Sequence, residues 1–336
     1  MNVLVTGGAG YIGSVICDRL IDEGHHVVVY DNMSKGHRDA VPAEAVLVEA
    51  DLLDADAVKT TIRNHEIDAV VHMAASSLVG ESMSRPEKYY RNNLWTSLGL
   101  IEAMTFSGVS RIVLSSTAAV YGNAARQPIE EHHETSPTNP YGETKLAVER
   151  ALHWHSLAHG MQYVALRYFN AAGATRMRGE RHSPETHLIP LVLEAAAEGR
   201  AVSVFGADYP TPDGTCVRDY VHVSDLARAH VKALDALGGG VTAATYNLGY
   251  GRGYSVRQVI DAAERVTGRP IRVEVQPRRP GDPAVLVASA ERIRAELGWT
   301  PEYTLDDIVG SAWEWMRDRG SPQAKEARYS AQPHAH

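Results

Sequence analysis

Two side chains four residues apart carry the clearest sign of chemistry in this sequence. Tyr141 and Lys145 belong to the run Tyr-Gly-Glu-Thr-Lys, which follows Pro137 and Pro140 and is expected to open a helix. A spacing of four places both side chains on one helical face. An ammonium beside a phenol favours the phenolate, so a tyrosine with a free pKa of about 10 could act as a base near neutral pH. The alternative is a surface pair on an amphipathic helix.

A glycine-rich turn near the N-terminus decides between those alternatives. Gly7, Gly10 and Gly13 lie between an apolar run and a helix-like stretch, and residues 8–13 also match G-x-G-x-x-G. Glycine permits a tight turn and lets a diphosphate approach the backbone, while the helix start offers free N–H groups. We therefore predict a bound dinucleotide on this turn, which includes Tyr11 and Ile12, and we expect Tyr141 and Lys145 to be catalytic.

Asp31 follows the second apolar run and favours NAD over NADP. A carboxylate there accepts hydrogen bonds from ribose hydroxyls and repels a 2′-phosphate. A turn-forming Asp before Asn32 is the alternative. Other residues follow the carboxyl ends of expected strands, where ligands bind in open α/β sheets. We assign to the cofactor site Asn32, Asp51, Leu52, Met73, Ala74 and Ala75.

Short apolar runs alternate with helix-like stretches over the first 170 residues. Strands are expected at 3–5, 27–30, 45–48, 69–72, 112–114 and 164–166, and helices at 12–23, 55–64, 87–107 and 141–159. Continuous apolar strands suit a parallel sheet covered on both faces, and the alternation predicts a doubly wound α/β fold of Rossmann type. Ser115 and Thr117 end the fifth strand and would present hydroxyls to the same crevice.

Composition excludes several classes of protein. Of 336 residues, 44% are hydrophobic and 22% charged, so the chain is not disordered throughout. The net charge is 33 − 41 = −8, which argues against nucleic acid or an anionic membrane as the main partner. No run approaches the length of a membrane span. Two cysteines, Cys17 and Cys216, cannot form a disulfide framework, so we expect a reducing compartment, the cytoplasm.

The alternation of apolar runs and helix-like stretches becomes less regular after residue 170. We predict an NAD-binding Rossmann domain over 1–170, to which about 219–250 return. A smaller mixed α/β substrate lobe would cover 171–320, and 321–336 would form a flexible tail.

The motifs then lead to a family. The glycine turn, the hydroxyl residues after the fifth strand and Tyr141-x-x-x-Lys145 resemble the extended short-chain dehydrogenase/reductases. The second half narrows the match, because it resembles the UDP-glucose 4-epimerase family. The resemblance runs from residue 1 to about 318 and is carried by 166–170, 204–211, 213–215, 217–223 and Arg279-x-Gly281-Asp282.

The resemblance implies roles for individual residues. Tyr141 is similar to the family's catalytic base, Lys145 to its partner on the nicotinamide ribose, and Thr117 to the residue that bonds the sugar 4-hydroxyl. Further cofactor contacts are implied for Asn92, Ser115 and Tyr168. The UDP-sugar would be bound by Asn170, His187, Leu188, Ser203, Val204, Phe205, Arg218, Tyr220, Arg279, Asp282 and Leu286. Two arginines among these could neutralise a diphosphate.

Three positions depart from some family members. Ser77 stands where certain members carry a lysine near the phosphates, and His187 where some have asparagine. Leu286 aligns with the position that gates the sugar pocket, and its intermediate size leaves tolerance of an acetamido group open.

The implied activity is C4 epimerisation of a UDP-hexose through bound NAD and a 4-keto sugar. A UDP-N-acetylglucosamine or UDP-pentose 4-epimerase shares every motif and stays open. A nucleotide-sugar 4,6-dehydratase is less favoured, because Ala118 and Ala119 follow Thr117 where that chemistry needs an acidic pair. A non-catalytic NAD-binding protein is disfavoured by the presence of both Tyr141 and Lys145.

The resemblance also implies a homodimer formed through the helices near 87–107 and 141–159. We expect no metal ion: the one metal-like run, Glu130-Glu131-His132-His133-Glu134, lies in a polar loop, and His153 and His155 do not share a helical face.

Overall fold

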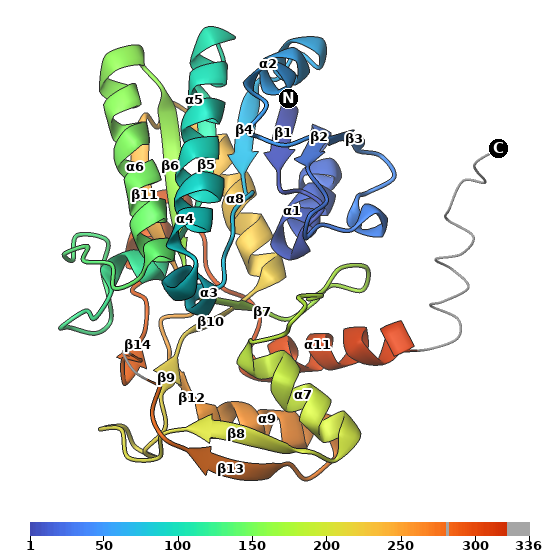
Figure 1. Ribbon diagram of the computed structural model, residues 1–336, viewed down its shortest axis with the longest axis vertical. Helices are drawn as coiled ribbons and strands as arrows, with labels where there is room; N and C mark the ends of the chain where they lie inside the picture. The colour runs from blue at the N-terminus through green and yellow to red at the C-terminus, as the bar shows by residue number, and fades with distance from the viewer. Residues whose placement is uncertain (280–281, 321–336) are drawn as a thin grey trace.

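A seven-stranded parallel sheet forms the centre of the protein (Figure 1). The computed structural model describes residues 1–279 and 282–320. The strand order is β11-β6-β5-β4-β1-β2-β3, and every neighbouring pair is parallel. The doubly wound fold class is therefore confirmed. The strands are β1 Asn2–Thr6, β2 His26–Asp31, β3 Val46–Glu49, β4 Ala69–His72, β5 Arg111–Thr117, β6 Gln162–Tyr168 and β11 Ala243–Leu248.

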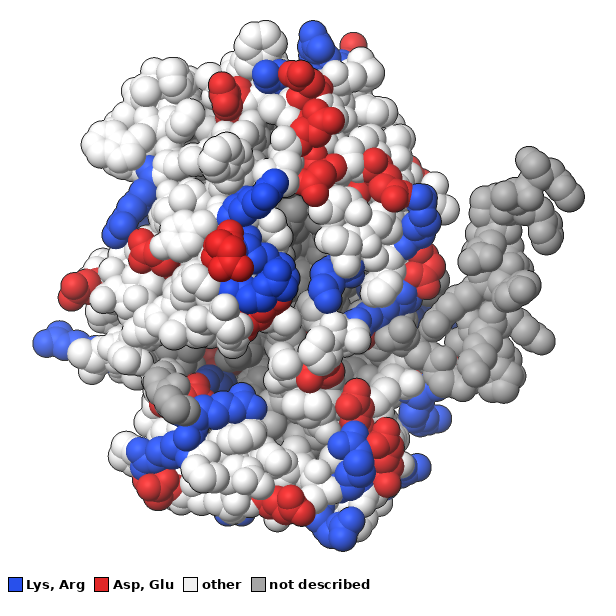
Figure 2. All heavy atoms as spheres, viewed as in Figure 1, with Lys and Arg blue, Asp and Glu red and all other residues white. Residues whose placement is uncertain are grey.

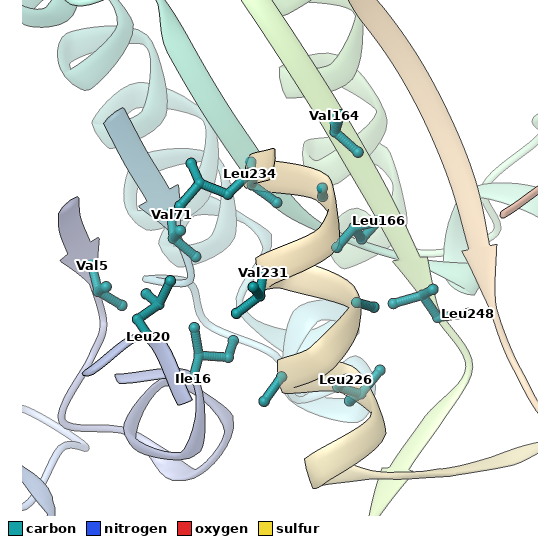
Figure 3. Packing of buried hydrophobic residues seen from close by; sticks show 14 of the residues in the cluster. Val5, Ile16, Leu20, Val71, Val164, Leu166, Leu226, Val231, Leu234 and Leu248 are labelled. Atoms are coloured by element: carbon teal, nitrogen blue, oxygen red, sulfur yellow. The ribbon is translucent and has the colours of Figure 1, made fainter. Parts of the chain in front are cut away.

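Helices cover both faces of this sheet because successive side chains of each strand point to opposite sides. Leu4 packs with α2 (Ala55–Asn64), α5 (Thr96–Phe106) and α6 (Pro140–His159) on one face. Its neighbours Val3 and Val5 pack with α1 (Tyr11–Asp22) and α8 (Val223–Gly238) on the other. Figure 3 shows this second layer, in which Ile16 and Leu20 of α1 lie close to Val231 and Leu234 of α8.

The long helix expected over 87–107 is interrupted. The chain forms α3 (Val79–Ser84), α4 (Pro86–Tyr89), a π-helical turn η2 (Tyr90–Trp95) and then α5. Such wide turns are frequent at functional sites. This one turns the Asn93 side chain inward, where it accepts from the Ser76 amide at 2.8 Å and donates to Thr144 Oγ1 at 3.2 Å. Short 3₁₀ turns η1 (Arg38–Ala40) and η3 (Ala118–Tyr121) complete this half.

A smaller lobe lies below the sheet in Figure 1. Its strands β8 (Ala201–Phe205) and β13 (Arg272–Gln276) are parallel. Helices α7 (Leu188–Glu198), α9 (Val256–Thr267) and α11 (Leu305–Gly320) contribute to its separate core. Two small sheets link the halves: β7 (Asn170–Ala172) pairs with β10 (Tyr220–His222), and β9 (Val217–Arg218) lies between β12 (Tyr254–Ser255) and β14 (Val285–Leu286).

The chain crosses between the two halves more often than the sequence indicated. β11 lies in the central sheet, and α8 packs against it. α10 (Glu291–Leu297) also returns, and Trp299 is fully buried in the core beside α8. The Trp299 indole donates to the Asp225 carbonyl at 2.9 Å, which fixes this second return. The predicted tail 321–336 lies outside the described residues.

Among the described residues, no helix combines the length and the apolar character that a membrane crossing requires.

Candidate active site

One cleft collects the residues assigned to the cofactor. It has a volume of about 650 Å³ and lies at the carboxyl ends of the central strands, where ligands bind in open α/β sheets. Every residue assigned from the sequence to the cofactor lines it: Gly7, Gly10, Tyr11, Ile12, Gly13, Asp31, Asn32, Asp51, Leu52, Met73, Ala74, Ala75, Asn92, Ser115, Tyr141, Lys145 and Tyr168.

The glycine turn fits a dinucleotide diphosphate. Gly7 has a φ of 69°, which favours glycine, and a Cβ on Gly13 would lie only 2.2 Å from the Gly7 carbonyl oxygen. No side chain caps the start of α1 at Gly10, so its first N–H groups are not occupied by a cap. Free N–H groups at the positive end of a helix suit an anion.

Asp31 supplies the acceptor for the other end of the cofactor. It is 8% exposed, and its carboxylate accepts from the backbone amides of Ala9 at 3.1 Å and Met33 at 2.9 Å. Burial nevertheless raises the pKa of Asp31. Across the cleft, Asp51 accepts from the Asn32 amide group at 2.9 Å. These two carboxylates suit ribose and adenine donors and repel a 2′-phosphate, so the cleft fits NAD.

Helix α6 presents Tyr141 because its N-terminus is tightly defined. Asn139 caps the helix by accepting from the Gly142 amide at 2.9 Å, and Pro140 occupies the first turn. A Cβ on Gly142 would lie 2.5 Å from the Ala119 carbonyl oxygen, so only glycine lets the helix approach η3 this closely. The approach brings Tyr141 into hydrogen bonding with Thr117, which itself lies outside the cofactor cleft lining.

Burial and one hydrogen bond determine the electrostatics of Tyr141. Burial raises the pKa of Tyr141, and the hydrogen bond with Thr117 opposes this. Lys145 Nζ donates to the Ser115 carbonyl oxygen at 2.7 Å. Burial lowers the pKa of Lys145 to about 8, against the opposing charge of Glu149.

A buried ion pair joins α6 to the strands beside it. Both carboxylate oxygens of Glu149 accept from Arg167, at 3.0 Å from Nε and 2.6 Å from Nη2. The Glu149 carboxylate also accepts from the Ser116 hydroxyl. Arg167 donates to the Tyr121 hydroxyl at 2.8 Å, and Tyr121 donates to Asn247 Oδ1 at 2.7 Å. The network joins α6 to β5, β6 and β11, so it fixes the positions of Tyr141 and the strand-end hydroxyls relative to one another.

Tyr168 is fixed by a histidine that the sequence analysis missed. His230 Nδ1 donates to the Leu226 carbonyl at 2.8 Å, and burial lowers the pKa of His230 to about 4. The ring is therefore neutral, and its Nε2 accepts a hydrogen bond from the Tyr168 hydroxyl at 2.5 Å. This leaves the Tyr168 oxygen as an acceptor, and Ser115 bonds to it. His230 lies one helical turn after Leu226 on α8, a spacing too common to single out.

The residues assigned to the substrate form small groups in and beside the smaller lobe. Arg279 Cζ lies 3.9 Å from the centre of the Phe205 ring. Arg218 donates to the Asp282 carboxylate at 2.8 Å, and Leu286 is its register partner in β14. Guanidinium groups and an aromatic ring are the side chains that suit a nucleoside diphosphate.

The other residues predicted to bind the substrate differ in location and in burial. Asn170 and Tyr220 are register partners in β7 and β10, and Asn170 Nδ2 donates to the Asp219 carbonyl at 3.0 Å. Val204 is 1% exposed in the core of the smaller lobe, so its side chain packs and only its backbone could meet a ligand. The remaining three are Ser203, exposed on β8, and His187 and Leu188 at the start of α7.

Sequence reasoning also missed charged residues of the cleft. Lys35 and Lys88 both line it, and Lys88 Nζ lies 2.8 Å from Glu81 Oε1. Lys88 precedes Asn92 by four residues, and that spacing was the available signal. Figure 2 shows Lys and Arg side chains gathered in the band between the two lobes on the face it displays.

Known proteins are similar to this chain over most of its length. Residues 3–249 match the NAD dependent epimerase/dehydratase family. The chain is 49% identical over 332 residues to the UDP-glucose 4-epimerase of Corynebacterium glutamicum, covering 97% of this chain and 100% of that protein.

Solved structures of similar proteins have the same fold. The crystal structure of UDP-glucose 4-epimerase from Brucella ovis in complex with NAD is 46% identical, with a TM-score of 0.90 over 93% of this chain and 97% of that one. The Bifidobacterium longum UDP-glucose 4-epimerase in complex with NAD⁺ and UDP is 38% identical, with a TM-score of 0.89 over 96% and 100%. The resemblance predicted from the motifs is confirmed, and the chain belongs to the NAD-dependent epimerase/dehydratase family.

Proposed function

We propose that the protein is an NAD-dependent UDP-glucose 4-epimerase that interconverts UDP-galactose and UDP-glucose through a 4-keto sugar. The observation that carries the proposal is the joining of two sites. Tyr141 lines the cofactor cleft and is hydrogen-bonded to Thr117, while Arg218, one of the two arginines suited to a diphosphate, lies on β9 between the lobes. Relatives that share about half of the sequence carry the same name.

The protein's own residues account for the proton transfers. Tyr141 would accept the proton of the sugar 4-hydroxyl and return it after the sugar has turned. Thr117 would hold the developing charge on that oxygen, and Lys145 would orient the nicotinamide ribose. Bound NAD supplies the reversible acceptance of a hydride from C4. Because the pKa of Tyr141 is raised by burial, its ionisation needs the positive charge that the loaded cleft provides.

The reaction also requires that the protein binds UDP tightly and the hexose weakly. Arg218, Arg279 and the Phe205 ring provide charge and stacking for the nucleotide. The 4-keto sugar must rotate about its link to the diphosphate, so strong polar contacts to the ring would oppose turnover. Ala118 and Ala119 directly after Thr117 offer no proton-exchanging group, which disfavours a dehydratase.

The direct test needs purified protein with no added NAD. We expect UDP-galactose to be converted to UDP-glucose, and the reverse, because NAD is restored in every cycle. Product analysis by anion-exchange chromatography and NMR would separate the outcomes. A 4-keto-6-deoxy product would indicate a dehydratase, and failure to convert any UDP-sugar while NAD is bound would contradict the proposal. A parallel reaction with UDP-N-acetylgalactosamine decides the acetamido tolerance left open by Leu286.

A homodimer through α5 and α6 is part of the proposal. Large apolar side chains are exposed on and beside these helices: Trp95 and Phe106 are 71% exposed and Trp154 is 66% exposed. Figure 2 shows a largely uncharged surface over α5 and α6 at the upper left. Isolated apolar residues need no partner, but a contiguous patch marks an interface.

Light scattering tests the dimer. We expect twice the chain mass of 36.6 kDa for the wild type and a shift toward the monomer for Trp154→Glu. A 36.6 kDa wild-type species at working concentration would contradict this part of the proposal. The cytoplasmic location stays a prediction from the sequence.

A further inference from the structure

The segment between β7 and α7 holds a compact group of histidines and glutamates, Glu180, His182, Glu185 and His187, here called the 180–187 cluster. One donor atom from each of Glu180, His182 and His187 lies within 4.8 Å of the others. The two imidazole rings have centroids 5.3 Å apart at an interplanar angle of 40°. Donor atoms of a tetrahedral zinc site, about 2.0–2.2 Å from the metal, lie roughly 3.4 Å from one another. Small side-chain shifts would therefore complete the geometry.

His182 is the least satisfied member of the cluster. Its Nδ1 is buried and lies 2.5 Å from Glu180 Oε1, yet it has no hydrogen-bond partner among the described residues. The same Glu180 oxygen accepts from the backbone amides of Arg181 at 2.9 Å and His182 at 3.1 Å. A buried ring nitrogen facing a carboxylate without a hydrogen bond is costly. The two atoms are closer together than two ligands of one zinc ion, so a separation of the side chains by about 1 Å would let both bind the same cation.

Glu185 supplies the outer partner that metal-bound histidines need. Its Oε1 accepts from His187 Nδ1 at 2.7 Å, and the same oxygen accepts from the backbone amides of Thr186 and His187. The first bond places the proton of a neutral ring on Nδ1 and leaves the Nε2 lone pair free. A carboxylate that orients a histidine in this way is typical of zinc sites.

The segment is anchored on both sides of the cluster. Arg181 donates two hydrogen bonds to Asp39, at 2.6 and 3.0 Å, and Arg178 pairs with Asp18 of α1 at 3.1 Å. His187 immediately precedes α7 of the smaller lobe. Glu180 and His182 line the cofactor cleft. A bound ion would thus tie a segment fixed to the sheet half to the first turn of the smaller lobe, beside the cleft.

We propose that Glu180, His182 and His187 bind one divalent cation of the zinc type, with Glu185 as the outer hydrogen-bonding partner. Two imidazoles and a carboxylate suit zinc better than calcium or magnesium, which prefer all-oxygen sites. The ion acts as a structural clamp at the edge of the cofactor cleft. The proposal revises the expectation that no metal is bound, and it gives His187 a partner other than UDP. It stands on the side-chain geometry and does not depend on the epimerase activity.

The test measures metal binding directly. Tag-free protein with its NAD retained is treated with EDTA, dialysed and titrated with Zn²⁺ by calorimetry, and in parallel with Co²⁺, whose visible spectrum reports nitrogen and oxygen ligation. We expect one tight Zn²⁺ per chain, binding weakened at least tenfold in His182→Ala and in His187→Ala, and a rise in Tm on zinc addition in the wild type alone.

The control uses a second His–His–Glu group among the described residues. His132 and His133 have ring centroids 5.0 Å apart beside Glu130, but they lie in an exposed loop. His132→Ala should leave the zinc stoichiometry and affinity unchanged. Equal zinc binding by wild type and the His182→Ala/His187→Ala double variant would overturn the proposal, as would equal loss in His132→Ala. Folding of each variant is checked by circular dichroism and NAD content, so a misfolded variant is not scored.

Discussion

The sheet half and the smaller lobe build their parts of the site in different ways. In the sheet half, the residues assigned to the cofactor come from the ends of several strands and line one cleft. In and beside the smaller lobe, the residues assigned to the substrate form separate pairs, such as Phe205 with Arg279 and Arg218 with Asp282. The carboxyl ends of the parallel strands lie along one edge because all seven strands belong to a single sheet. The short strands of the second region pair only in sheets of two or three strands.

The difference matches what the proposed reaction asks of each region. NAD must stay bound through every cycle, which favours a preformed cleft. The hexose must turn, which favours a nucleotide grip made of a few charged and aromatic side chains. Substitutions in the sheet half should therefore abolish chemistry or stability, while those at the substrate pairs should mainly weaken substrate binding.

The largest effect is expected for Tyr141→Phe. Removal of the hydroxyl removes the proposed base while the ring and its packing against Tyr89 remain. We expect turnover to fall by about 10³-fold or more, which corresponds to about 4 kcal/mol of transition-state stabilisation. NAD content and UDP affinity should stay near the wild-type values. Wild-type turnover in this variant would refute the assignment.

The buried ion pair behind α6 should dominate stability. Glu149→Gln leaves Arg167 charged and buried without its carboxylate, and breaking such a pair typically costs about 3–5 kcal/mol. Urea denaturation measures the loss. The matched control is Arg265→Ala, which breaks the exposed pair with Asp306 and should change stability by less than about 1 kcal/mol. Similar losses in both variants would show that burial is not the deciding factor.

Lys145 should give the NAD-free protein a distinctive pH dependence. Its pKa is lowered to about 8 in the folded state from 10.5, so the unfolded chain binds more protons between those values. Stability relative to Lys145→Met should therefore rise from about pH 8 to pH 10.5, by up to about 3 kcal/mol. Denaturation curves across this range measure the difference. A difference that falls or stays flat with rising pH would contradict the burial of a charged Lys145.

The smallest effect belongs to the substrate pairs. Arg279→Ala should raise the KM for the UDP-sugar by about 10- to 100-fold with little change in kcat and none in NAD content. Its neighbour Arg278 bonds to Asp208 and lies over the Tyr209 ring, so Arg278→Ala is the matched control and should leave KM nearly unchanged. A kcat loss larger than the KM change in Arg279→Ala would remove the contrast between the two regions.

Much of this protein was predictable because the signals are local. The glycine turn, Asp31 at the end of β2, and the spacing of Tyr141 and Lys145 are short-range patterns whose meaning depends on one strand or one helix. Apolar runs sufficed for the parallel sheet. The π-helical turn over Tyr90–Trp95 was missed because no local pattern marks it, and the hydrogen bonds of its Asn93 join Ser76 and Thr144, which are distant in sequence.

The sequence by itself determined the fold class, the cofactor side of the site and the family, since local patterns and motif spacing carry that information. Only the tertiary structure decided the hydrogen-bond partners of this pair: Lys145 Nζ donates to the Ser115 carbonyl oxygen, and Tyr141 is hydrogen-bonded to Thr117. It likewise decided that Trp299 returns to the sheet core, that His230 fixes Tyr168, and that Glu180, His182 and His187 come together. Such long-range contacts depend on how separate elements pack, and no single stretch of chain encodes them.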